Sequence, residues 1–393
     1  MPTPIRRLLL LALLALLAGV PATAASLADA NAAARDFVRA TMKARGIPGL
    51  QVAVVRDGRV VFSESHGLAN VENRVPVEPT TLFPINSATK AFTGVAVMQL
   101  VQAGRVDLEA PISTYLVDLP PAWRAIRVRQ LLAHTSGLPD IVDAQGLVGA
   151  GPEPAAWQAL AAMPLQAAAG ERFAYNQTNY GLLARIVEAQ GAMPYAAFVA
   201  EHQFAPLRMR RSRFGDSYDL VAGAATVYSF LPRRSDAPGM PARLSHWFYD
   251  VPHGLWAGGG IQTTADELAQ WLVALMQGRL LDADVRERMW VPERLNDGSV
   301  GEWAAGWPVA GTAPHREVTS MGGARAAFRI YPDDGLAVVV LTNLVGADPQ
   351  DFIAGIAGFY RPAPAGGPAL NGDDPRVAIR CAASACHAPA VRK

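Results

Sequence analysis

The sequence predicts an α+β protein in which an antiparallel sheet is built from both ends of the chain and a mostly helical region lies between them. Three observations predict this fold. Residues 51–63 have a hairpin pattern, residues past 303 return to a period of two, and residues of about 105–280 are mostly helical in spacing. A sheet covered by helices buries both faces. The junction of sheet and helical region is then the natural place for a site.

The first predicted elements are a helix and a hairpin. Residues 28–45 carry apolar side chains at helical spacing and end before Gly46. Apolar runs at 51–55 and 60–63 flank Asp57-Gly58, a pair typical of tight hairpin turns. Residues of about 25–85 therefore supply the first part of the sheet.

The second part of the sheet is predicted near the C-terminal end, in residues of about 300–361. Four segments there alternate apolar and polar side chains, at 304–309, 317–321, 324–330 and 336–342. Residues 332–335 form a turn between the last two, and 352–359 read as a closing helix. The helical region between the two parts of the sheet spans about 105–280.

The composition and the N-terminal end indicate the compartment and exclude one class of partner. The chain has 393 residues, and its net charge of +1 argues against nucleic acid as a partner. Arg6-Arg7 precede an apolar run at 8–20 and then small residues up to Ala24, a pattern typical of a secretory signal peptide at 1–24. We expect a periplasmic or secreted protein without a membrane span after cleavage. An uncleaved anchor is the alternative.

The C-terminal end reads as an extension of a folded domain at 25–361. Residues 362–393 are rich in Pro, Ala and Gly without apolar periodicity, which indicates a flexible tail. The tail holds both cysteines, Cys381 and Cys386. A local disulfide is the simplest interpretation in an oxidising compartment. Haem attachment through Cys386-His387 is the alternative, although the spacing of the cysteines differs from the usual one.

The first candidate catalytic pair is Ser87 and Lys90. If a helix begins near Asn86 or Ser87, the hydroxyl and the amine lie one turn apart on the same face. A serine needs a base to become a nucleophile, and a neutral lysine can act as one. The following segment, 91–101, is apolar on nearly every face, which predicts a buried helix ending at Gly104. Surface residues of a helix are the alternative interpretation of Ser87-x-x-Lys90.

Two further segments carry candidate site residues. Tyr175 lies in a loop that enters a helix, where a phenol could relay a proton; a core tyrosine with a satisfied hydroxyl is the alternative. Gly322-Gly323 would let a strand approach a substrate closely. The N–H groups of Ser87 and Gly323 could then form an oxyanion hole. An ordinary strand with a bulge is the alternative.

Together these segments resemble the serine β-lactamase superfamily in its class C-like branch. That branch holds class C β-lactamases, D-alanyl-D-alanine carboxypeptidases, D-aminopeptidases and related esterases. The resemblance spans about 28–360. It rests on these motifs in the family's order: Ser87-Ala88-Thr89-Lys90, Leu131-Leu132-Ala133-His134-Thr135-Ser136-Gly137-Leu138, the Tyr175 segment, Pro206-Leu207-Arg208-Met209, Gly258-Gly259-Gly260 with Thr263-Thr264-Ala265-Asp266, and Val338-Val339-Val340-Leu341-Thr342-Asn343.

The resemblance implies a β-lactamase/transpeptidase-like fold and assigns roles to three residues. Ser87 would be the acylated nucleophile, Lys90 its base partner and Tyr175 a second acid or base. His134 would be a structural turn residue. The substrate would be a small molecule or a peptide, and no metal or cofactor would be required.

The chain departs from the family pattern in two places. The second motif usually reads Tyr-x-Asn, whereas Gln177 here carries the amide on a longer arm. The third motif usually offers a cation and a hydroxyl before its glycine, but this chain has Ser320-Met321-Gly322. Arg325 is the nearest substitute for the cation, and on a strand it could equally point away. We therefore expect ester or amide substrates without a free carboxylate, with Gln177, Ser320, Gly322 and Arg325 as candidate substrate-binding residues.

The sequence thus predicts an exported serine hydrolase with an acyl-enzyme mechanism, of esterase, peptidase or weak β-lactamase-like activity. The alternative is a non-catalytic, penicillin-binding-like relative that binds cell-wall peptide or a partner. The altered third motif keeps this alternative open. The sequence makes no prediction of the oligomeric state.

Overall fold

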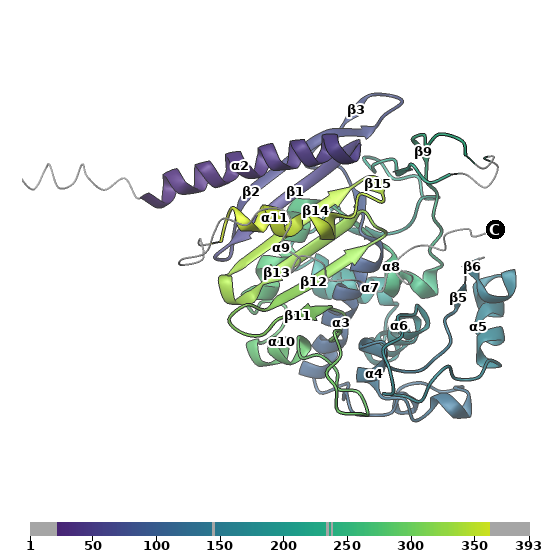
Figure 1. Ribbon diagram of the computed structural model, residues 1–393. Coiled ribbons are helices and arrows are strands. Elements are labelled where there is room, and N and C mark those ends of the chain that lie inside the picture. The colour runs from purple at the N-terminus through teal and green to yellow at the C-terminus, as the bar shows by residue number, and fades with distance from the viewer. Residues whose placement is uncertain (1–21, 144–145, 233–235, 237–238, 362–393) are drawn as a thin grey trace, which may run out of the picture.

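The structure is a computed structural model that describes residues 22–143, 146–232, 236 and 239–361. Its largest element is a seven-stranded antiparallel sheet in the order β11-β12-β13-β14-β1-β2-β3 (Figure 1). The strands are β1 (Gly49–Arg56), β2 (Arg59–Asn70), β3 (Val75–Pro76), β11 (Val309–Ala310), β12 (Glu317–Gly322), β13 (Ala326–Tyr331) and β14 (Leu336–Thr342). Because β1 pairs with β14, segments from both ends of the chain meet in the middle of the sheet. The predicted α+β arrangement is confirmed.

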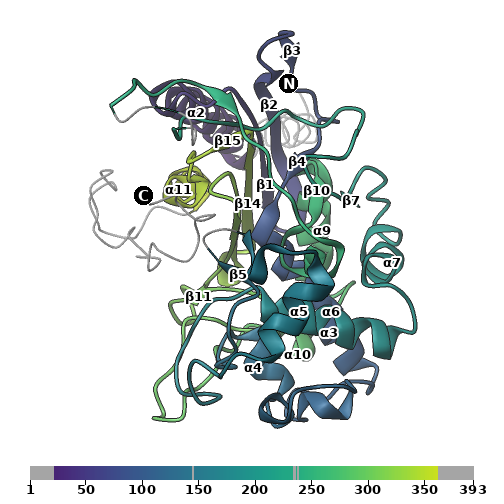
Figure 2. The same cartoon turned by 90° about the vertical axis from the view of Figure 1, so that its right-hand side faces the viewer.

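The central strands are buried on both faces by helices. In β1, Val52 and Val54 pack into the layer of α2 (Ala22–Arg45) and α11 (Ile353–Gly358). Ala53 and Val55 belong to the larger core on the other face, which α9 (Ala265–Met276) covers. Figure 2 shows the two helical layers on opposite sides of the sheet. Alternate side chains of a strand point to opposite faces, so an apolar strand between two layers fills both cores.

The helical part packs around α3 (Lys90–Gln102), whose side chains are buried from Lys90 to Met98 and at Leu100. This confirms the predicted buried helix. The other helices are α4 (Val128–Leu132), α5 (Glu153–Ala161), α6 (Thr178–Gly191), α7 (Tyr195–Val199), α8 (Trp256–Gly259) and α10 (Ala283–Met289). The short strands are β4 (Phe83–Pro84), β5 (Val142–Asp143), β6 (Gly146–Leu147), β7 (Arg213–Phe214), β8 (Tyr228–Ser229), β9 (Ser245–His246), β10 (Ile261–Thr263) and β15 (Leu344–Val345). Since α10 follows α9, the helical part extends past its predicted limit near residue 280.

The predicted strand at 304–309 is wrong for most of its length. Only Val309 belongs to a strand, β11, because the chain turns before it. Gly306 adopts a φ of 90°, and the N–H of Ala304 donates to the carbonyl of Trp307 at 2.8 Å. Pro308 has no N–H to contribute to a ladder. Apolar residues in a turn mimicked the alternation of a strand.

Residues 1–21 of the predicted signal peptide, the predicted tail at 362–393 and both Cys381 and Cys386 lie outside the described residues. Within the described ranges, no helix combines the length and the apolar character needed to cross a membrane.

Asn343 joins the N-terminal and the C-terminal segments of the sheet, and its loss should destabilise the fold. Its side chain is fully buried, accepts from the N–H of Gly49 at 2.8 Å and donates to the carbonyl of Leu68 at 3.0 Å. We expect Asn343→Ala to lower the free energy of unfolding by ~2–4 kcal/mol, because one buried and one half-buried backbone group lose their partner. Urea unfolding measures this, with the exposed Asn73→Ala as control. Equal stability of the two variants would contradict the assignment.

Candidate active site

Ser87 lies where the sheet meets the start of the central helix. It belongs to a 3-10 turn, η1 (Asn86–Thr89), that continues directly into α3. Ser87 is partly exposed, whereas Ala88, Thr89 and Lys90 behind it are buried. Asn86 adopts a φ of 44°, a left-handed conformation that turns the chain sharply just before the serine. The hydroxyl is therefore presented from a rigid helix start.

Lys90 is almost completely enclosed, with 1% of its surface exposed. Its Nζ donates to Gln177 Oε1 and to the carbonyl oxygen of Gly258, both at 2.9 Å. The same nitrogen lies 4.7 Å from the centre of the Tyr175 ring and 5.0 Å from that of Tyr180. Lys90 of the first motif is thus brought together with Tyr175 and Gln177 of the second, one helical turn from Ser87.

Gly258 contributes to the lysine site through its backbone, a role that sequence reasoning missed. A Cβ atom at this position would lie 2.8 Å from Gln177 Oε1 and 3.5 Å from Lys90 Nζ. Any side chain here would push into the lysine and its amide partner. The triple-glycine run was the available signal, but a carbonyl acceptor leaves no side-chain trace in a sequence.

A hydrogen-bond network joins the His134 loop to the segment that carries Tyr175 and Gln177. His134 Nδ1 accepts from the N–H of Asn176 at 3.3 Å and from Asn179 Nδ2 at 3.1 Å. Because both donors point at Nδ1, we place the ring proton on Nε2. Ser136 Oγ donates to Asn179 Oδ1 at 2.6 Å. The histidine is thus part of a turn, as the family resemblance implied, and it organises the tyrosine loop.

His134 also packs behind the candidate acid/base. Its ring centre lies 4.4 Å from that of Tyr175 and 5.1 Å from that of Trp303. Burial, with a smaller contribution from the nearby Lys90 amine, lowers the pKa of His134 well below its ordinary value. The ring is therefore neutral at physiological pH and acts as a flat, uncharged support for Tyr175.

Asp140 is a second residue that sequence reasoning missed. Its Oδ1 accepts from the N–H of Gln177 at 2.9 Å and from that of Val142 at 3.3 Å. Burial raises its pKa, while these hydrogen bonds oppose that shift. The carboxylate fixes the backbone of Gln177 at the beginning of α6, where an anion is favoured. Its only signal was its place two residues after Leu138 of the His134 motif.

The third motif contributes mainly backbone to the neighbourhood of Ser87. A Cβ atom on Gly322 would lie 1.9 Å from the carbonyl oxygen of Ile85 and 2.6 Å from Ser87 N, so only glycine fits there. Gly323, which has a φ of 58°, comes next and lies against the side chain of Asn86. Ser320 is 2% exposed, and its Oγ donates to the carbonyl of Ala88 at 3.3 Å. The serine hydroxyl is thus directed into the protein.

Arg325, which could have pointed away, turns toward the serine. Its Nη2 donates to Asn86 Oδ1, and its Cζ lies 4.7 Å from the ring centre of Tyr249. Its exposed fraction is 2%. The structure therefore places Tyr175 and Gln177 at the Lys90 amine, and Gly322, Gly323 and Arg325 at the turn formed by Asn86 and Ser87. Ser320 is directed inward, to the carbonyl of Ala88.

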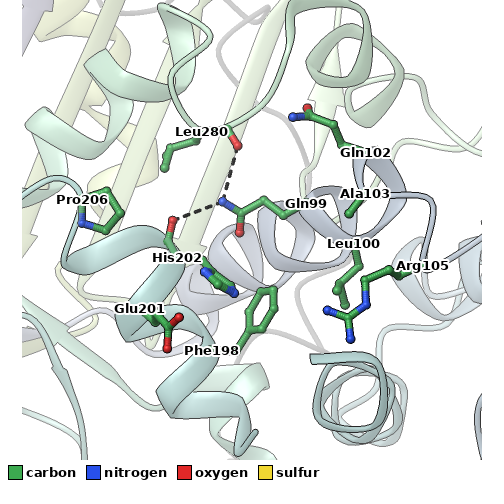
Figure 3. A pocket seen from close by; sticks show the side chains of 10 residues that line it. All are labelled: Gln99, Leu100, Gln102, Ala103, Arg105, Phe198, Glu201, His202, Pro206 and Leu280. Carbon is green, nitrogen blue, oxygen red and sulfur yellow. Dashed lines mark hydrogen bonds between the residues drawn. The ribbon is translucent and has the colours of Figure 1, made fainter. Parts of the chain in front are cut away.

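A cavity of about 340 Å³ lies elsewhere, at the C-terminal end of α3 (Figure 3). Gln99, which lines it, donates through Nε2 to the carbonyls of His202 at 3.2 Å and Leu280 at 3.4 Å. At about 1.5 Å of rise per residue, this end of the helix is roughly 20 Å from Ser87. The cavity is therefore separate from the candidate active site.

The family model described as Beta-lactamase matches residues 34–358. Protein flp of Staphylococcus aureus (strain MW2) is 31% identical over 174 residues, which are 43% of this chain and 35% of that protein. The chain thus matches about a third of the length of that curated relative.

Solved structures show the same likeness. A penicillin-binding protein homologue from Pyrococcus abyssi, described as octameric, is 25% identical, with a TM-score of 0.70 over 83% of this chain and 76% of that one. A class C beta-lactamase is 18% identical, with a TM-score of 0.71 over 85% of this chain and 97% of that one. The second likeness is one of fold.

The neutral His134 should make stability depend on pH. The pKa of His134 is lower in the folded chain than its ordinary value of 6.5, so His134 contributes to the free energy of unfolding above pH 6.5. This contribution is lost as the pH falls, because the unfolded chain takes up a proton that the folded chain does not. When the pH falls from 7.5 to 5.5, we expect the free energy of unfolding to drop by about 1.4 kcal/mol less in His134→Gln than in the wild type. Urea titrations at both pH values measure this, with the exposed His315→Gln as control. An equal loss in all three proteins would contradict it.

Proposed function

The chain belongs to the beta-lactamase family, and we propose that it is a serine hydrolase that forms an acyl-enzyme on Ser87. The observation that carries this proposal is the enclosed amine of Lys90, one turn from Ser87. A neutral amine has two hydrogens and one lone pair. Gln177 Oε1 and the Gly258 carbonyl both accept from Lys90 Nζ. Burial favours the uncharged form of the amine, in which it can accept the serine proton.

The proposed reaction follows from these positions. Ser87 Oγ attacks the substrate carbonyl carbon, and its proton passes through Lys90 and Tyr175 to the leaving oxygen or nitrogen as that bond breaks. The N–H groups of Ser87 and Gly323 hold the oxyanion. A water molecule then attacks the acyl-enzyme and returns the proton to Ser87.

The two departures from the family pattern have a consistent interpretation in this mechanism. Gln177 keeps the lysine contact through Oε1, which leaves its Nε2 to donate to a substrate carbonyl. Ser320 supports the turn that carries Ser87, so the third motif acts through its glycines. We propose esters or amides as substrates, and export to the periplasm or medium, which the basic and apolar pattern of residues 1–24 supports.

The nucleophile can be tested by intact mass spectrometry. Wild-type protein and Ser87→Ala are incubated separately with a penicillin and with a p-nitrophenyl ester. We expect an acyl adduct or turnover in the wild type and neither in the variant, because the attacking oxygen is gone. Equal turnover in Ser87→Ala would refute the assignment. Retained ligand binding with no adduct or turnover in the wild type would favour a binding protein.

The lysine site can be tested with two neighbouring glycines. Gly258→Ala would place a Cβ 2.8 Å from Gln177 Oε1, whereas Gly259→Ala would meet atoms no nearer than 3.7 Å. Both residues lie in α8. We expect Gly258→Ala to slow acylation at least tenfold, because a rise of about 1.4 kcal/mol in the activation free energy is enough for that. We expect Gly259→Ala to change the acylation rate little. The acylation rate is measured with the p-nitrophenyl ester. A similar effect of both variants would argue against the lysine contact.

A further inference from the structure

The cavity at the C-terminal end of α3 has an unsatisfied hydrogen-bond acceptor in its wall. Gln99 Nε2 donates to the carbonyls of His202 and Leu280, so the amide oxygen must lie on the other side of the group (Figure 3). This Oε1 atom is buried and has no hydrogen-bond partner in the described ranges of the chain. A buried acceptor without a donor is costly. The cavity therefore suits a ligand that brings a donor group to Gln99.

The backbone beside the cavity fixes this orientation of Gln99. Helix α7 continues into η5 (Ala200–Phe204), a π-helical turn. The residue four positions after His202 is Pro206, which has no N–H, so the carbonyl of His202 is left to the side chain of Gln99. π-helical turns are rare and often lie at functional sites. The turn is thus a second, independent indication that the cavity binds a ligand.

The inner wall of the cavity is apolar. Leu100, Phe198 and Leu280 line it, and the rest of each side chain is enclosed by the fold. The rings of Phe198 and His202 meet edge to face, with their centres 4.2 Å apart and their planes at 84°. The cavity volume of about 340 Å³ lies at the lower end of the range for ligand pockets. This wall suits a small molecule with an apolar body.

Two charges of opposite sign lie at the rim of the cavity. Arg105 follows the end of α3 and Glu201 belongs to η5, and both residues are exposed. Neither side chain makes an ion pair or a hydrogen bond within the part of the chain that the structure describes. Figure 3 shows them on opposite sides of the Phe198 ring. A ligand on that ring would meet a carboxylate at one end and a guanidinium at the other.

We propose that this cavity binds a small zwitterion, a free α-amino acid with an apolar side chain. Its ammonium group donates to Gln99 Oε1 on the side of Glu201, and its carboxylate pairs with the Arg105 guanidinium. The apolar side chain packs on Phe198. A donor, an anion and an apolar body are the three features that the walls require, and such an amino acid combines them in a small volume. The site lies roughly 20 Å from Ser87 and does not depend on the proposed hydrolysis.

The site can be tested by calorimetric titration with leucine, with leucinamide, which lacks the carboxylate, and with N-acetylleucine, which lacks the ammonium group. Ser87→Ala protein is used so that no probe is hydrolysed. We expect leucine to bind at least fivefold more tightly than either relative. Adding Arg105→Gln should remove only the preference over leucinamide, and adding Glu201→Gln only the preference over N-acetylleucine, because each variant deletes one charged partner.

Matched controls separate the site from general effects of charge. Arg59→Gln and Glu78→Gln each remove one exposed charge elsewhere on the chain, and both should leave the two preferences unchanged. Melting temperatures verify folding. Preferences that neither Arg105→Gln nor Glu201→Gln alters would show that leucine binds elsewhere, which overturns the proposal. Absence of saturable binding for both leucine and phenylalanine at millimolar concentrations would overturn it as well.

Discussion

The enclosure of one lysine amine is the constraint on which the site depends. Lys90 begins the central helix, α3. Its amine lies where α3, the start of α6 and α8 meet. The N-terminal end of α6 supplies Gln177, and α8 supplies the carbonyl of Gly258. An amine without such partners would not stay inside an apolar core. The glycine at 258, the Asp140 contact with the Gln177 backbone and the His134 network all serve this one placement.

Much of the arrangement was predictable from the sequence. The sheet built from both ends of the chain followed from strand periodicity. Ser87, Lys90 and Tyr175 followed from motifs in which the side chains themselves carry the proposed chemistry. The contributions of Gly258, Asp140 and Tyr249 were not predictable, because they act through a carbonyl, a helix-end contact and a loop that no periodicity describes. The turn at Gly306 was mistaken for a strand for a related reason: apolar alternation does not report φ.

The third motif shows how a fold can keep a shape while its side chains change. The family cation is absent from position 320, yet the strand still reaches the serine because Gly322 brings backbone against backbone. The positive charge reappears at Arg325, after the turn rather than before it. Because Arg325 lies in the turn, its guanidinium packs under the ring of Tyr249 and not along the strand. Arg325 therefore contacts both the turn that precedes the serine and the Tyr249 loop.

The pairing of β1 with β14 has a consequence for how the protein is made. Gly49 and Asn343, which hydrogen-bond across this junction, are 294 residues apart in the chain. During synthesis the N-terminal hairpin has no central neighbour until the last strand has emerged, and contacts so distant in sequence form slowly. The serine turn cannot be braced by Gly322 before then. An incomplete chain therefore holds Ser87 and Lys90 without the strands that position them, and the candidate site is assembled only once synthesis is nearly finished.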